Sequence, residues 1–600
     1  MSYWNTGYLG LAVFGDGELN VLNGASVEGA FLYLTEEPEV TATVTVGGSA
    51  PDGTYSLVDF TTVDIGYEGV GILNVVDGGQ IDTTSLVLAE RTTGSGTLNV
   101  GLGGVAGTVL ASMTTFGSGR STINFNHTGD ISFDSDIRQN GGVAATINVI
   151  QGRTLLTGGL SNHSATVNIQ GGTLAFETAN AVGTGQINMS GGTLTSTRNE
   201  TLTHSLLDVQ AGSSTISAVA GRALALDSSS VALRDGAELH FGTATDTGTV
   251  ILLPSFVLQD PGEIDVFLDY GTVRFGSVAA NRFFYTPFAT VDLSATIAAG
   301  ATLDVNGYMA SFNGLSGTGT VLNGAASTVD VFLGSGTYST AFRESSTGGD
   351  MSVFVTGSGL TTLTADSDFS GRLTVENGTL RLEGDLSTDD VRVSDGTLEM
   401  AGGDFTGAPV VEQSANGIFD ITSSGGTVSV GGLTTTATAG NSAEVRLGND
   451  LRIVGTPADG TYGTTAMISG TGSVYVNNGQ GVQVFAAANT YMGDTRIQDG
   501  TLALTNSEGL GASGHGTYVE QGGTLDLRNG IYVISEPLTL GGGSYASDNL
   551  ATLRSSDSVA NYGGDLSQTL AGSAGQPESG HTYAAREANC WKPVFPFATI

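Results

Sequence analysis

Apolar residues flank single polar residues in a short phrase that recurs along the first third of the chain. In Leu98-Asn99-Val100, the two apolar side chains share one face of a strand and the asparagine takes the other. Successive copies follow at intervals of 20 to 29 residues. Their central residues form one column: Asn20, Thr45, Asn74, Asn99, Asn124, Asn148, Asn168, Asn188 and Asp208. The pattern predicts a short strand in each repeat, always in the same phase.

A second phrase, of the type Gly-Gly-Thr-Leu, follows several of these triplets and continues into the second half of the chain. Its glycines supply the positive φ that a sharp turn needs, and Thr-Leu begins the next strand. Copies start at Gly171, Gly191, Gly236, Gly300, Asn377, Asp395, Asp499 and Gly522. The chain is therefore expected to be all-β, with short strands separated by tight turns.

Repeats of about 20 to 25 residues are too small to form separate hydrophobic cores, but they can stack as coils that bury their apolar residues on one another. Leucine-rich repeats have a similar period but need helical returns and a fixed leucine pattern, which these turns lack. An antiparallel sandwich is the other way to arrange many short strands. The constant phase of the triplet over nine copies favours a parallel β-helix, that is, a β-solenoid.

Asparagine is depleted in ordinary strands, so its place in the triplet needs an explanation. In a stacked solenoid, equivalent residues of neighbouring coils lie about 4.8 Å apart, and side-chain amides at that spacing can form a hydrogen-bonded ladder. A tolerated, exposed polar residue is the alternative. If the register is right, neighbouring column members lie opposite one another in one sheet.

The repeats divide the chain into four regions. Residues 1–249 carry the triplet repeats, and residues 297–576 carry the Gly-Thr-Leu repeats. Between them, residues 250–296 are expected to form irregular coils of the same solenoid, with an aromatic run at 282–288 that serves either as a stacking patch or as a packed cap. Residues 577–600 contain the only lysine, Lys592, and the only cysteine, Cys590, and are expected to be disordered.

The composition of the chain argues against several classes of partner and site. The net charge of -38 at pH 7 disfavours nucleic acids and anionic membranes as partners. One cysteine excludes an internal disulfide and a cysteine-rich metal site. The longest apolar run, 250–258, is too short for a membrane-spanning helix and contains Pro254. We therefore expect a monomer without cofactors and without a membrane-spanning segment.

No motif for catalysis was found. The chain has no serine-protease turn, no GxSxG elbow and no HExxH helix. Of its six histidines, His240 is expected to point outward as a solvated strand residue. The acidic candidates for a polysaccharide lyase or hydrolase are three aspartate pairs: Asp134 with Asp136, Asp366 with Asp368, and Asp389 with Asp390. Turn aspartates are the alternative interpretation. No residue is assigned as catalytic, cofactor-binding or metal-binding.

Two longer stretches resemble a known family. GATLDVNGYMASFNGLSGTGTVLNG at 300–324 and AANTYMGDTRIQDGTLALTNSEGLGASG at 487–514 are similar to passenger repeats of bacterial autotransporters, the type V secreted proteins. The resemblance implies a right-handed β-helix at the surface of a Gram-negative cell or outside it. It also implies a non-enzymatic role in adhesion to host or matrix macromolecules, glycans or other cells, with a carbohydrate-active β-helix enzyme as the alternative. Because neither a signal peptide nor the family's outer-membrane barrel is recognised, we expect a passenger fragment or the product of an interrupted reading frame.

Overall fold

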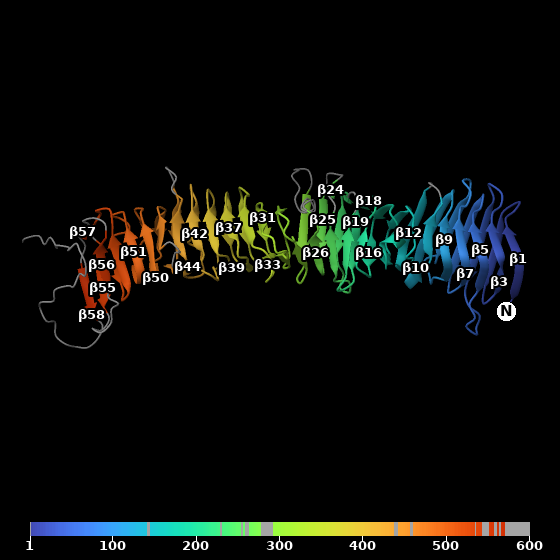
Figure 1. Ribbon diagram of the computed structural model, residues 1–600, viewed down its shortest axis with the longest axis horizontal. Coiled ribbons are helices and arrows are strands. Elements are labelled where there is room, and N and C mark those ends of the chain that lie inside the picture. Colours follow the sequence, from blue (N-terminus) through green and yellow to red (C-terminus); the bar gives the residue numbers. More distant parts are fainter. Residues whose placement is uncertain are drawn as a thin grey trace, which may run out of the picture. The chain divides into compact units, whose positions relative to one another are not determined.

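The computed structural model describes residues 2–140, 144–227, 231–253, 256–258, 263–277, 292–436, 442–455, 460–534, 536–542, 551–556, 561–562 and 566–570. The aromatic run at 282–288 and the tail at 577–600 lie outside these residues. The described chain is almost entirely β, and its strands pair in parallel and stack coil upon coil (Figure 1). The predicted fold class, a parallel β-solenoid, is confirmed. Contacts divide the chain into two units, the first containing residues 1–309 and 316–322, and the second 310–315 and 323–600.

The first coils of unit 1 contain two long strands each, one in each of two sheets. One sheet contains β1 (Tyr3–Leu11), β3 (Ser26–Leu34), β5 (Leu57–Ile65), β7 (Gln80–Leu88), β9 (Thr108–Phe116) and β11 (Asp136–Gln139). The other contains β2 (Gly17–Leu22), β4 (Thr41–Gly47), β6 (Val70–Val76), β8 (Ser95–Val100), β10 (Arg120–Phe133) and β12 (Ala145–Leu156). Each strand of the second sheet carries a triplet of the repeat.

Later coils of unit 1 have three faces of shorter strands. The face that continues the triplets contains β13 (Thr166–Ile169), β15 (Gln186–Met189), β18 (Leu206–Val209), β21 (Val231–Leu233) and β24 (Phe256–Leu258). The next contains β14 (Thr173–Phe176), β16 (Gly192–Ser196), β19 (Gly212–Ala218), β22 (Ala237–Phe241), β25 (Glu263–Leu268) and β27 (Asp292–Ile297). The third contains β17 (Glu200–Leu202), β20 (Ala223–Leu226), β23 (Thr249–Leu252), β26 (Thr272–Phe275), β28 (Thr302–Asp304) and β30 (Thr320–Asn323).

Unit 2 also has faces of short parallel strands. One contains β29 (Ala310–Phe312), β31 (Val329–Leu333), β34 (Met351–Val355), β37 (Arg372–Val375), β40 (Asp390–Val393), β42 (Val410–Gln413) and β45 (Gly432–Thr435). A second contains β32 (Gly336–Tyr338), β35 (Leu360–Leu363), β38 (Thr379–Leu382), β41 (Thr397–Met400), β43 (Ile418–Ile421), β46 (Glu444–Leu447) and β49 (Met467–Gly470). A third begins with β33 (Ala341–Glu344), β36 (Ser367–Asp368) and β39 (Leu386–Ser387).

The last described coils of unit 2 share a larger sheet and a two-stranded one. The larger sheet contains β44 (Val428–Val430), β47 (Leu451–Ile453), β48 (Thr461–Thr464), β50 (Val474–Phe485), β51 (Thr495–Leu504), β52 (Thr517–Val519), β53 (Gly523–Leu527), β55 (Leu538–Gly542), β56 (Thr552–Ser555) and β58 (Leu566–Leu570). The two-stranded sheet pairs β54 (Tyr532–Val533) with β57 (Asn561–Tyr562). Helical structure in the described ranges is limited to α1 (Ala179–Val182), and none of it has the length and apolar character needed to cross a membrane.

The core is a set of apolar columns that run from coil to coil. Leu73, Leu98, Ile123 and Ile147 stack in register on β6, β8, β10 and β12, and all four are fully buried. Burial of each such side chain contributes about 1.5 to 3 kcal/mol. The repeat therefore places its aliphatic residues where each coil covers the next.

The outer side of the same strands carries the predicted asparagine ladder. All nine members of the column, from Asn20 to Asp208, lie opposite one another in register. Each asparagine from Asn74 to Asn188 donates through Nδ2 to the preceding member, at 2.7 to 3.2 Å. The register and the ladder are both confirmed. The ladder stops at Asp208, whose carboxylate accepts hydrogen bonds from Arg234 at 2.8 and 2.9 Å.

Candidate interaction surface

The aspartate pair Asp134 and Asp136 in unit 1 bonds to the next coil. The carboxylate of Asp134 accepts hydrogen bonds from the hydroxyls of Ser132 and Thr157, which lower its pKa. The carboxylate of Asp136 accepts the backbone N–H of Leu160 at 2.9 Å. Both carboxylates therefore stabilise turns between coils, as the turn interpretation predicts.

In unit 2, one member of the predicted pairs, Asp366, also bonds to the next coil. The carboxylate of Asp366 accepts the backbone N–H of Asp385 at 2.9 Å, and the carboxylate of Asp385 accepts that of Asp404 at 3.0 Å. Asp368 and Asp389 are exposed. In the described ranges, no three residues among His, Cys, Asp and Glu are grouped so that they could hold a metal ion. Asp366 and Asp385 thus cap successive coils, and none of the paired aspartates is joined by further carboxylates in such a group.

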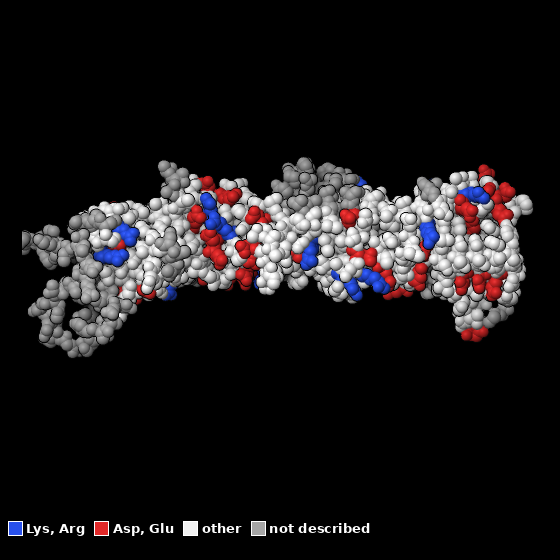
Figure 2. All heavy atoms as spheres, viewed as in Figure 1, with Lys and Arg blue, Asp and Glu red and all other residues white. Residues whose placement is uncertain are grey.

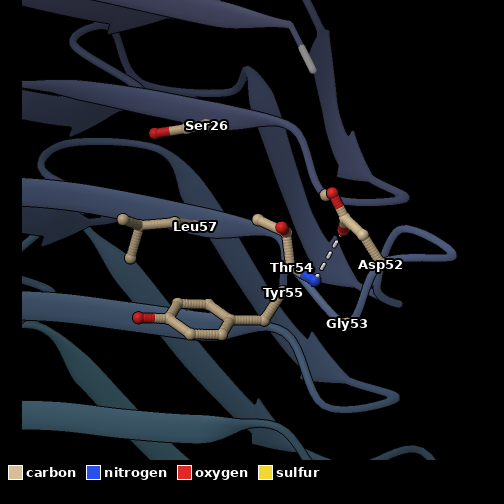
Figure 3. Close-up of a pocket in the computed structure, with 7 residues that line it drawn as sticks. Ser26, Asp52, Gly53, Thr54, Tyr55 and Leu57 are labelled. Atoms are coloured by element: carbon tan, nitrogen blue, oxygen red, sulfur yellow. Dashed lines mark hydrogen bonds between the residues drawn. The ribbon is translucent and has the colours of Figure 1, made fainter.

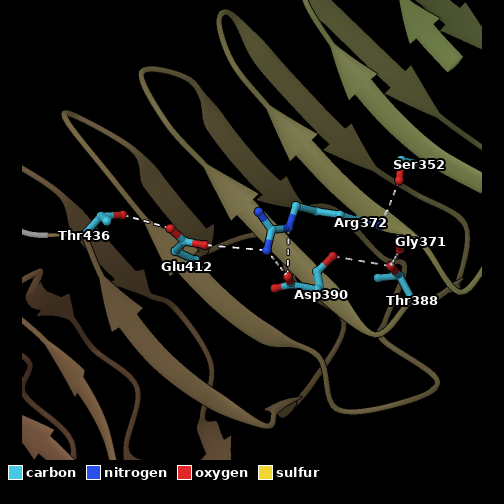
Figure 4. Close-up of polar contacts among 7 residues, drawn as sticks. All are labelled: Ser352, Gly371, Arg372, Thr388, Asp390, Glu412 and Thr436. Carbon is cyan, nitrogen blue, oxygen red and sulfur yellow. Dashed lines mark hydrogen bonds and ion pairs between the residues drawn. The ribbon is translucent and has the colours of Figure 1, made fainter. Parts of the chain in front are cut away.

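Asp390, the last of these candidates, belongs to a charged chain on the outer face of unit 2. Arg372 Nε donates to Asp390 at 2.7 Å, and its Nη2 lies 3.9 Å from the carboxylate of Glu412 (Figure 4). Thr436 in turn donates to Glu412 at 2.8 Å. Such exposed pairs contribute little to stability. Their main effect is to fix a pattern of charge on the surface.

Asn489 and Tyr491 of the Asn-Thr-Tyr phrase face inward, where they close a corner of the coil, and Thr490 between them is exposed. Asn489 accepts the backbone N–H of Ile468 at 2.9 Å and donates to the carbonyl of Gly509 at 2.7 Å. Tyr491 is fully buried, and its hydroxyl bonds to that of Thr495. The phrase that carries the family resemblance therefore builds the scaffold, and it leaves the outer faces free to differ.

The surroundings of His240 differ from the prediction. His240 lies on the outer side of β22, but it stacks on Phe267 with centroids 4.6 Å apart and bonds to Asp269 at 2.7 Å. The interpretation as a solvated residue is therefore wrong, because the register brings an aromatic ring beside it. His127, His163 and His204 are buried, and burial lowers the pKa of each.

Buried His204 predicts a loss of stability in acid. Burial lowers its pKa to about 4, against an ordinary value of 6.5. Between these two pH values, His204 binds a proton in the unfolded chain but not in the folded chain. The free energy of unfolding therefore falls as the pH falls below 6.5. The loss approaches about 3 kcal/mol near pH 4. In thermal melts from pH 7 to 4.5, His204→Gln is expected to flatten this dependence, whereas His515→Gln, at an exposed site, leaves it unchanged. Equal slopes for both variants would contradict the assignment.

A shallow pocket lies on unit 1 beside the turn that precedes β5 (Figure 3). It has a volume of about 400 Å³ and is lined by Gly24, Ser26, Asp52, Gly53, Thr54, Tyr55 and Leu57. The carboxylate of Asp52 accepts the backbone N–H of Thr54 at 2.9 Å, and this bond lowers its pKa. Tyr55 is 45% exposed. The pocket offers one aromatic ring and several small polar groups, but no buried charge.

A denser group of rings covers the outer side of the first coils, and we call Tyr8, Phe31, Tyr33 and Tyr67 the aromatic patch. Tyr33 is central: its ring centroid lies 5.5 Å from that of Tyr8, 6.2 Å from Phe31 and 5.7 Å from Tyr67. Tyr8 is 51% and Phe31 43% exposed. The guanidinium of Arg91 lies 5.0 Å from the Tyr67 ring centroid and donates to its hydroxyl. Contiguous exposed rings of this kind mark interaction sites.

Carboxylates surround the aromatic patch. Glu36, Glu37, Glu39, Glu68 and Glu90 lie in the turns that follow β3, β5 and β7. In the view of Figure 2, acidic side chains gather around a small basic spot at this end of unit 1. The aromatic patch was not identified from the sequence. Alternation in Phe31-Leu32-Tyr33-Leu34 does place both rings outward, but the contact with Tyr67 depends on a turn.

Comparison with known proteins supports the resemblance drawn from the repeats. Residues 355–382 and 477–504 match the model of the passenger-associated-transport-repeat family. Over 545 aligned residues the chain is 26% identical to the Adhesin BmaC autotransporter of Brucella suis biovar 1 (strain 1330), covering 77% of this chain and 16% of that protein. The chain thus spans about a sixth of the length of this relative. No solved structure matches at a significant level. The predicted resemblance to an autotransporter passenger domain is confirmed.

Proposed function

From these passenger repeats, we propose that the chain is part of a non-enzymatic autotransporter passenger, exposed at the cell surface or released outside the cell, that acts in adhesion. The similarity to a Brucella protein named as an adhesin supports this role. The observation that carries the proposal is that the residues of the repeat phrase point inward and build the scaffold, while other residues form the outer surface. The repeat phrase closes corners from inside, whereas the outer faces present polar, charged and aromatic groups in register.

A solenoid of this kind suits contact with a large partner. Equivalent outer residues recur from one coil to the next, so a polymer or a cell surface can make many weak contacts at once. After the first contact the others form at a high effective concentration, which raises the overall affinity. The expected partners are host or matrix macromolecules, glycans or other cells. The net charge of -38 makes nucleic acid a poor partner. In the proposed function the passenger acts as a monomer.

Adhesion can be measured with beads that carry the full chain. We expect the beads to be retained under flow on cell layers or on immobilised matrix proteins and glycans, whereas beads carrying the heat-unfolded chain are washed away. The chain is also expected to release no unsaturated sugar from a polyuronate. The double variant Asp366→Ala and Asp368→Ala serves as a control and should adhere like the wild type.

Two results would overturn the proposal. Beads that carry the folded chain and adhere to none of these surfaces would contradict a role in adhesion. Release of unsaturated product by the wild type, and its loss in the double variant, would instead establish the lyase alternative.

A further inference from the structure

An acidic side chain is buried beneath the aromatic patch, on the side of the strand that faces outward. On β5, Val63 and Ile65 point into the core, and Asp64 between them points out, opposite Tyr33 of β3. Asp64 is nevertheless only 1% exposed. Among the described residues, no amide, hydroxyl or guanidinium group donates to either of its carboxyl oxygens, and its polar neighbour is the carboxyl of Glu90, which can bond to it when one of the two is protonated. Burying a carboxyl group without such a partner costs free energy, so its presence needs a reason.

The titratable and charged groups around Asp64 come from the two neighbouring coils and from the turn that follows its own strand. Tyr33 contributes from β3, and Glu90 and Arg91 follow β7, whereas Tyr67 and Glu68, which follow β5, act on Tyr33 and Arg91. Burial, and after it the charge of the Glu90 carboxyl and a hydrogen bond with that carboxyl, raise the pKa of Asp64 to about 8 against the opposing effect of Arg91. The same surroundings raise the pKa of Tyr33, again mainly through burial. At neutral pH the surroundings therefore favour the protonated form of Asp64, mainly because the carboxyl group is buried and Arg91 offsets this only in part.

The geometry favours an organic cation over a metal ion as the missing charge. Aromatic faces attract guanidinium and ammonium groups but supply no ligand for a metal, and no metal-holding group of three exists in the described ranges. Arg91 already shows the favoured contact, with its guanidinium over Tyr67 and its Nε 3.0 Å from the Tyr67 hydroxyl. The acidic turns around the patch complement further positive charge, and so oppose an acidic partner.

We propose that the aromatic patch docks a basic segment of a protein partner, with arginine or lysine side chains lying on Tyr8, Phe31 and Tyr33 and pairing with the exposed carboxyl group of Glu90, close above the buried carboxyl of Asp64. The inference rests on the proposed adhesive function and names a surface and a partner class for it. Docking places a cation beside Asp64, so the carboxyl group loses its proton to solvent when the complex forms. Binding therefore releases a proton at neutral pH.

The test titrates the full chain with a labelled peptide of alternating arginine and serine, because arginine stays charged across the whole pH range. We expect the double variant Tyr8→Ser and Phe31→Ser to lower affinity about tenfold. The matched control is the double variant Phe332→Ser and Phe354→Ser, which removes a stacked outer pair 5.1 Å apart on unit 2 and should bind like the wild type. A citrulline–serine peptide should not bind.

Proton release separates this site from general attraction to an acidic chain. Wild-type affinity is expected to rise about tenfold from pH 6.5 to 8.5. Calorimetry near pH 7 in buffers of different ionisation enthalpy should detect the released proton. Asp64→Asn keeps the shape of the side chain and should abolish both effects. Equal loss of affinity in the two double variants, or binding of the citrulline peptide, would overturn the inference.

The same beads distinguish failure of the inference from failure of the proposed function. Beads carrying Tyr8→Ser and Phe31→Ser that adhere as well as the wild type would refute the docking surface and leave adhesion standing. Peptide binding as expected, with no adhesion of wild-type beads, would refute the function and leave the site standing.

Discussion

Gly378→Ala is expected to destabilise unit 2 by about 3 kcal/mol or more and to lower its thermal transition by about 5 °C. Gly378 has φ +66°, a conformation that alanine adopts only at a cost. A Cβ at this position would also lie 2.4 Å from the carbonyl oxygens of both Gly357 and Gly359. These are backbone atoms of the preceding coil, so they cannot move aside as a side chain would.

The control for this prediction is Gly407→Ala. Gly407 is exposed, and a Cβ there would meet nothing within 4 Å. Calorimetry of the two variants beside the wild type measures the difference. The two segments that match the family model have the same length, so they align residue by residue. Gly500 then occupies the position of Gly378 in the second repeat, and it also has a positive φ, +80°. A Gly378→Ala protein that melts with the wild type would show that this turn tolerates a side chain.

Asn124→Ala is expected to destabilise unit 1 by about 2 kcal/mol. Asn124 donates to Asn99 at 2.8 Å and accepts from Asn148 at 2.7 Å, so alanine breaks the ladder at its middle. The Oδ1 of Asn99 and the Nδ2 of Asn148 then lose their partners while still half-buried. In a unit of this size, the expected fall in the thermal midpoint is about 3 °C.

Thr122→Ala is the matched control for the ladder. Thr122 lies two residues earlier on β10, faces the same side and is similarly half-buried. Its replacement removes comparable contact area without touching the amide bonds. If the two variants lose the same stability, the ladder contributes nothing beyond packing, and the asparagines are merely tolerated.

The first half of the fold could be predicted because one short phrase keeps its phase. The column stays in register across a 29-residue step from Thr45 to Asn74, and also where the coils change from two long strands to three short ones. Extra residues are absorbed in turns, since a shift of one residue would turn the aliphatic flanks outward. The number of strands in each coil was not predicted, because the triplet marks only one of them.

Other features depend on contacts that no repeat encodes. In the first matched repeat, Ser367 takes the place of Asn489 and accepts the backbone N–H of Phe342, so the same corner is closed by a different residue. Asp64 is outward by alternation and would be expected in solvent. Only the rings and turns of neighbouring coils bury it. The candidate surface therefore could not be found from strand patterns alone.

The ladder also has a direction, and this makes each coil a template for the next. From Asn74 to Asn168, each Nδ2 donates to the preceding coil and each Oδ1 accepts from the following one, so each of these coils offers a carbonyl oxygen to the next; the Oδ1 of the last asparagine, Asn188, accepts from Gln186 of its own strand. An incoming asparagine copies both register and orientation by donating to that oxygen, as nearest-neighbour assembly of a solenoid requires. An ionised aspartate has no proton to donate. Asp208 therefore ends the ladder, and its carboxylate accepts a hydrogen bond from Arg234 in place of one from a further asparagine.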